Sequence, residues 1–166
     1  MAFISKKIED LINFRIVEEE KSSRLYLAMS KWLTYNGYNG AAALWAKYAE
    51  EETVHVNWAY TYLEDLDILP KVPALEQPQA KFKGLVDICK LSYEHEILVT
   101  QQCNDLAKAA QAEGDYMTLQ LAQKYLTEQT EEIARQTYWL DRIEAFGTEP
   151  DMLRELDEEM GEKAEG

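Results

Sequence analysis

The amino-acid sequence predicts an all-α fold: a four-helix bundle with one long crossover between its second and third helices, and a short fifth helix. Apolar residues recur every three or four positions over four long segments, at about 5–35, 40–67, 83–112 and 115–145. The connection after the second segment is about 15 residues long and holds three of the four prolines, which is enough chain to run along a bundle. No strand-like alternation competes with these patterns.

Turn residues separate the four long segments. The first helix is expected to end at "YNGYNG" (35–40), and the second ends before the proline-rich stretch. Between the third and fourth lies "EGD" (113–115), in which Gly114 can terminate one helix and Asp115 can cap the next. The third and fourth helices are therefore expected to form a tight antiparallel hairpin.

The fifth helix is predicted from "GTEPD" (147–151), because proline is favoured in the first turn of a helix. We expect it to cover about 149–160 and to be followed by a frayed polar tail, "GEKAEG". At 166 residues the chain is long enough for one well-buried domain and short for two. The sequence thus predicts a single domain over 1–166, with the bundle at about 5–145.

The formal net charge of −14 argues against binding to nucleic acid or to an anionic membrane, because both need a surface rich in Lys and Arg. Cations are the more natural partners. Cys89 and Cys103 lie too far apart along one predicted helix to bridge each other, and free thiols are typical of a cytoplasmic protein. The N-terminal residues show no signal peptide, and no apolar run is long enough to span a membrane.

An acidic residue interrupts the apolar stripe of each long helix near its midpoint. The interruptions are Glu19, Glu96, Glu132 and, in "EEETVH" (50–55), Glu52 together with His55. A single Glu on an apolar stripe usually extends its side chain to solvent, so each of these acids taken alone is best interpreted as solvent-exposed and not as a metal ligand. In a bundle of helices of similar length, however, midpoints lie at one level, so all five side chains are expected to converge.

Four carboxylates in a low dielectric cannot all stay ionised without cations. Ion pairing with Lys or Arg in a purely structural bundle is one solution, but the predicted stripes contain neither residue. Two divalent metal ions are the other solution, and an oxygen-rich ligand set with one imidazole favours iron or manganese over structural zinc. The spacing of Glu52 and His55 puts both on one helix face, so that Glu52 can bridge two ions while His55 binds one.

From about residue 8 to 147 the sequence resembles the bacterial-type non-haem ferritins. The resemblance includes "YNGAAA", "HEILVTQQCNDLAKAA" and "YLTEQTEE" in addition to the spaced acids. It implies a ferritin-like fold and a ferroxidase that oxidises Fe(II) with O2 or H2O2. It also implies a homo-oligomeric hollow shell of 24 subunits that stores iron as a ferric mineral.

The resemblance also assigns residues. One iron would be held by Glu19, Glu52 and His55, and a second by Glu52, Glu96 and Glu132, with Gln129 beside the pair as a further candidate. Tyr26 matches a tyrosine next to the iron site, which can form a hydrogen bond with an iron ligand or donate an electron. A third, neighbouring iron site would be formed by Glu51, Glu128 and Glu131.

Two departures from related families bear on cofactors. Bacterioferritins have a haem-ligating Met directly after the bridging Glu and a second Glu-x-x-His in the fourth helix, whereas this chain has Thr53 and Glu131 at those positions. No haem is therefore expected. A di-iron oxidase or peroxidase without storage would share the whole ligand set, and the size of the particle in solution separates that alternative from a storage shell.

Overall fold

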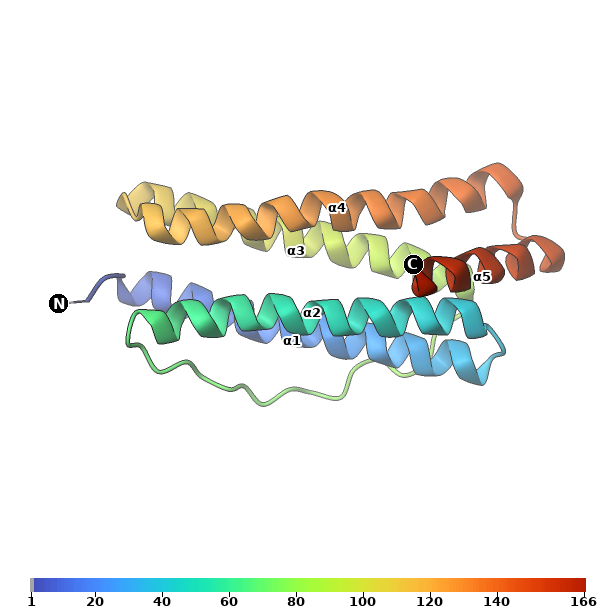
Figure 1. Cartoon of the computed structure of the whole chain (residues 1–166), viewed down its shortest axis with the longest axis horizontal. Helices are drawn as coiled ribbons and strands as arrows, with labels where there is room; N and C mark the ends of the chain where they lie inside the picture. Colours follow the sequence, from blue (N-terminus) through green and yellow to red (C-terminus); the bar gives the residue numbers. More distant parts are fainter. Residues whose placement is uncertain (1) are drawn as a thin grey trace.

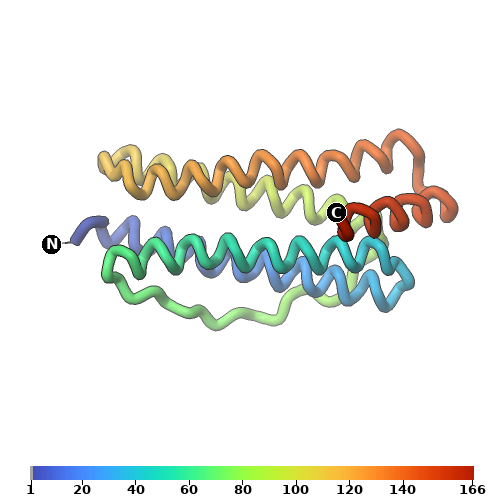
Figure 2. Tube along the Cα trace, viewed as in Figure 1, coloured from blue at the N-terminus to red at the C-terminus, as the bar shows by residue number. Residues whose placement is uncertain are grey.

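The computed structural model describes residues 2–166, which form five α-helices and no strand. They are α1 (Lys6–Tyr35), α2 (Asn39–Asp65), α3 (Leu85–Glu113), α4 (Tyr116–Phe146) and α5 (Pro150–Glu165). The first four lie side by side as a bundle, and the connection between α2 and α3 runs along the outside of the α1–α2 pair from one end to the other (Figures 1 and 2). The predicted fold class is confirmed.

Side-chain caps fix two of the helix starts. Ser5 Oγ accepts a hydrogen bond from the Ile8 amide at 3.2 Å, and Asp115 Oδ1 accepts one from the Thr118 amide at 3.0 Å. Each satisfies one of the amides that the first turn of a helix leaves without a partner. Gly114 ends α3 in the left-handed conformation (φ 67°), so α4 begins two residues later and returns beside α3, as predicted.

The apolar core is divided into two clusters by a polar layer. On α1, Ile16 belongs to the cluster towards the N-terminal end of the helix and Tyr26 to the other, while Glu19 and Ser22 lie buried between them. Burial of a large apolar side chain stabilises a fold by roughly 1.5–3 kcal/mol, so the two clusters can hold the helices in register around a layer that is costly to bury. The layer lies at the level where the acids were expected to converge.

Helix α5 is longer than the sequence predicted. The expected end near residue 160 and the frayed tail are wrong, because the helix continues to Glu165. Its buried residues Leu156 and Met160 pack into the core, and Gly161 lies against Gly40 of α2. A Cβ atom on Gly40 would come within 1.9 Å of the Asp157 carbonyl oxygen, so this close approach requires glycine at position 40.

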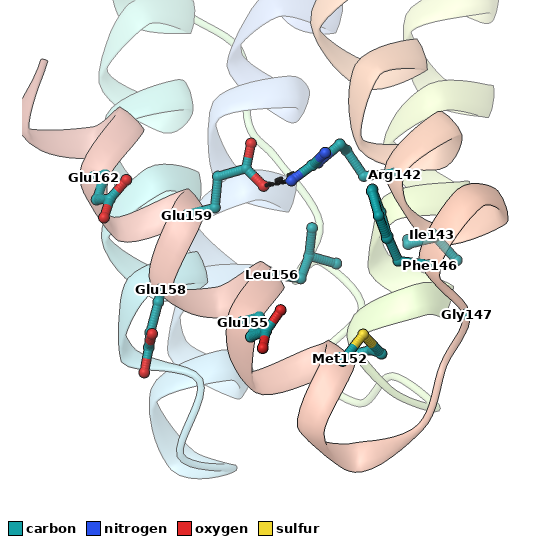
Figure 3. Close-up of a pocket in the computed structure, with 10 residues that line it drawn as sticks. All are labelled: Arg142, Ile143, Phe146, Gly147, Met152, Glu155, Leu156, Glu158, Glu159 and Glu162. Carbon is teal, nitrogen blue, oxygen red and sulfur yellow. Dashed lines mark hydrogen bonds and ion pairs between the residues drawn. The ribbon is translucent and has the colours of Figure 1, made fainter.

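A pocket of about 400 Å³ lies between α5 and the end of α4 (Figure 3). It is rich in acidic side chains, and Arg142 donates to Glu159 Oε2 at 2.7 Å across it. Cys89 and Cys103 are free and buried, in agreement with the predicted thiols. None of the helices described has an apolar stretch long enough to cross a lipid bilayer.

Candidate metal centre

The five predicted side chains converge in the polar layer, one or two from each helix of the bundle. The relative exposures of Glu19, Glu52, His55, Glu96 and Glu132 lie between 1% and 4%. Burial of so many ionisable groups in one place is rare unless something compensates their charge. The convergence predicted from the spacing of the acids is therefore present in the fold.

These side chains form two ligand groups that share Glu52. Glu19, Glu52 and His55 each offer an atom within 4.8 Å of the others, and so do Glu52, Glu96 and Glu132. His55 Nδ1 lies 2.9 Å from Glu52 Oε2 and 3.8 Å from Glu19 Oε2. A carboxylate common to two groups is the arrangement that a pair of bridged metal ions requires.

The electrostatics of the centre also favour a cation. Both carboxylate oxygens of Glu19 are buried and have no hydrogen-bond partner among residues 2–166. Burial, and then the charge of Glu52, raise the pKa of Glu19 well above its usual value. Burial, and then the charge of Glu96, raise the pKa of Glu132 to about 9. Without metal these groups tend to hold protons, which a divalent ion would displace.

Two neutral side chains orient Glu96. The Tyr26 hydroxyl donates to Glu96 Oε1, and the Gln129 amide donates to Glu96 Oε2 at 2.9 Å. Burial, and then the charge of Glu96, raise the pKa of Tyr26 well above its usual value, so the hydroxyl keeps its proton and acts as the donor. Tyr26 and Gln129 therefore lie beside the centre as predicted, and in this structure both contact it through Glu96.

Comparison with known proteins agrees with this geometry. The family model described as "Ferritin-like domain" matches residues 9–146. The chain belongs to the ferritin family. It is 34% identical to a bacterial non-heme ferritin of Escherichia coli O6:H1 over 155 residues, which are 93% of this chain and 92% of that one. It is 35% identical to a bacterial non-heme ferritin of Campylobacter jejuni, covering 87% of this chain and 86% of the relative.

A solved ferritin structure has the same fold. The open pore ferritin of Archaeoglobus fulgidus superposes with a TM-score of 0.92 at 27% identity, covering 95% of this chain and 97% of that one. Ferritin family and fold together support iron storage and a homo-oligomer. The carboxylate and imidazole groups in the polar layer are able to hold iron.

The three acids predicted for a third iron site do not come together in this ferritin. Among residues 2–166, Glu128 forms a ligand group with His55 and Glu132, and no group contains Glu51 or Glu131. Glu131 is exposed. Successive helix residues are rotated by about 100°, so Glu131 turns away from the bundle when its neighbour Glu132 faces inwards.

Two arginines next to the centre were not predicted, because the predicted stripes contain no Lys or Arg. Arg15 is 1% exposed, and its Nη1 lies 3.8 Å from Glu19 Oε1. Arg135 Nη2 donates to Glu132 Oε1 at 2.8 Å. Each lies three or four residues from its acid on the same helix, and this spacing was the available signal. The ferritin centre therefore has part of its negative charge balanced by its own side chains.

Proposed function

We propose that the chain is the subunit of a cytoplasmic iron-storage ferritin that oxidises Fe(II) at an intra-subunit di-iron centre. One iron is bound by Glu19, Glu52 and His55, and the other by Glu52, Glu96 and Glu132. The observation that carries the proposal is the sharing of Glu52 by two buried ligand groups. The buried free thiols are in keeping with a reducing compartment.

In the proposed reaction each of two Fe(II) ions loses one electron. The two electrons, with two protons, reduce O2 to H2O2 or cleave H2O2 to two molecules of water. The carboxylates supply hard oxygen ligands and negative charge, which stabilise Fe(III) more than Fe(II). Tyr26 and Gln129 hold Glu96 in place while the charge on the irons changes.

Storage requires that Fe(III) leaves the centre and accumulates as a mineral inside a hollow shell, which we propose has 24 subunits and contains no haem. The net charge of −14 would concentrate cations at such a shell. Light scattering or ultracentrifugation of the purified protein tests this part. A particle of the mass of 24 chains supports storage, whereas a stable dimer would indicate a di-iron oxidase that does not store iron.

Aerobic addition of Fe(II), followed by ferric absorbance, tests the oxidation. The variant carrying Glu52→Ala and His55→Ala should lose the fast initial rise in ferric absorbance, because both ligand groups lose a member. Glu50→Ala is the matched control, since Glu50 is the exposed acid two positions before Glu52. If the double variant oxidises iron as fast as the wild type, the assignment of the centre is wrong.

A further inference from the structure

Arg135 occupies a position among three carboxylates at the edge of the metal centre. Its Nη1 donates to Glu51 Oε2, and its Nη2 donates to Glu132 Oε1 at 2.8 Å and lies 4.0 Å from Glu128 Oε1. Two of these three acids, Glu51 and Glu128, are residues that the resemblance assigns to a third iron. A single side-chain cation therefore contacts two of the three acids from which a third metal site would be built.

The guanidinium is held in this position by more than its ion pairs. Arg135 Cζ lies 4.9 Å from the centre of the Tyr48 ring, which is a cation–π distance, and the side chain is 30% exposed. Charge-assisted hydrogen bonds to two carboxylates from different helices fix its orientation further. Arg135 is thus part of the α2–α4 interface and not a freely solvated surface arginine.

We propose that Arg135 takes the place of the third iron, so that Glu51, Glu128 and Glu131 bind no Fe(II) beside the two positions that share Glu52. The inference rests on the proposed function, since it concerns the number of irons at that centre. Arg135 contacts both Glu51 and Glu132, but Glu132 still offers an oxygen to one of the two groups that share Glu52, whereas Glu51 belongs to no candidate ligand group in the described part of the chain. The positive charge of the guanidinium repels a cation beside Glu51. The exposed Glu131 supplies no replacement ligand.

The proposed absence of a third iron is not explained by a lack of access for ions to Glu51. Glu51 and Arg135 both line a surface pocket of about 210 Å³, together with Tyr48 and Lys163. Ions in solution can therefore reach Glu51. It follows that removal of the arginine charge should be enough to let these acids take up a cation.

Anaerobic equilibrium binding of Fe(II), counted per subunit, tests the proposal. Arg135→Met should bind about one ion more than the wild type, and the gain should disappear when Glu51→Ala is added. Glu51→Ala alone should leave the wild-type number unchanged. Arg142→Met is the matched control, because Arg142 lies two turns further along α4 and pairs with Glu159 of α5 (Figure 3), and it should also leave the number unchanged.

Two results would overturn the inference. One is an Arg135→Met variant that binds the same number of ions as the wild type; the other is a loss of one ion from the wild type on Glu51→Ala. Arg135→Gln repeats the test with a side chain that can still donate to Glu132, in case the Met variant folds poorly. Failure of the di-iron centre itself would appear differently, as equal binding by the wild type and the Glu52→Ala, His55→Ala variant.

Discussion

Replacement of Glu19 by Gln should stabilise the metal-free protein and at the same time impair its reaction with iron. Glu19 is 1% exposed, neither carboxylate oxygen has a hydrogen-bond partner among residues 2–166, and its contact with Arg15, at 3.8 Å, is too long for a hydrogen bond. Leaving a buried polar group without a partner costs about 1–3 kcal/mol. Gln has nearly the same volume and is neutral without taking up a proton, as the buried Glu19 must do in the metal-free protein, and its amide can donate to Glu52.

For a chain of this size, 1 kcal/mol changes the melting temperature by about 2–4 °C, so the melting temperature should rise by about 2–12 °C. The assay is scanning calorimetry of chelator-treated protein, with Glu50→Gln as the exposed control. The initial rate of Fe(II) oxidation should fall at least about tenfold, since Glu19 is one of the iron ligands that we propose. A metal-free Glu19→Gln variant that melts below the wild type, or one that retains the wild-type rate, would refute this reasoning.

Three further predictions concern the same structure. Because the pKa of Glu132 is raised to about 9, the folded metal-free protein holds a proton that the unfolded chain releases near pH 4.5. The denaturant concentration at which half of the metal-free protein is unfolded should therefore decrease as the pH is raised from about 5 to 9, and a bound divalent ion should reduce this decrease. Tyr26→Phe leaves Glu96 without one of its donors, so it should slow Fe(II) oxidation and destabilise the protein by about 1 kcal/mol in denaturant titrations. Gly40→Ala should displace α5 and lower the melting temperature, whereas Gly37→Ala, at a turn with open space, should lower it less.

The convergence of the acids could be predicted from the sequence because helical periodicity makes an inward-facing acid conspicuous among apolar residues. Glu52 and His55 are the clearest case, since their spacing alone puts both on one face. The arginines were missed for a related reason. Arg15 and Arg135 share a helix face with Glu19 and Glu132, four and three residues away, but a basic side chain at such a position usually extends to solvent, so the spacing alone does not show that these two turn towards the acids.

The end of α5 was beyond sequence reasoning because tertiary contact decides it. Gly161 in a polar stretch reads as a helix terminator, since Gly disfavours helix interiors by about 1 kcal/mol relative to Ala. In the fold it faces Gly40, and Met160 beside it is fully buried. The contact between α2 and α5 is therefore able to offset the low intrinsic propensity, and nothing near Gly161 in the sequence identifies its partner.

The most direct test of the proposed centre is iron-edge anomalous diffraction from crystals soaked in Fe(II) without oxygen. The account predicts two strong peaks per subunit on either side of the Glu52 carboxylate, one beside Glu19 and His55 and the other between Glu96 and Glu132. Iron bound only at surface acids, with no peak at Glu52, would contradict it.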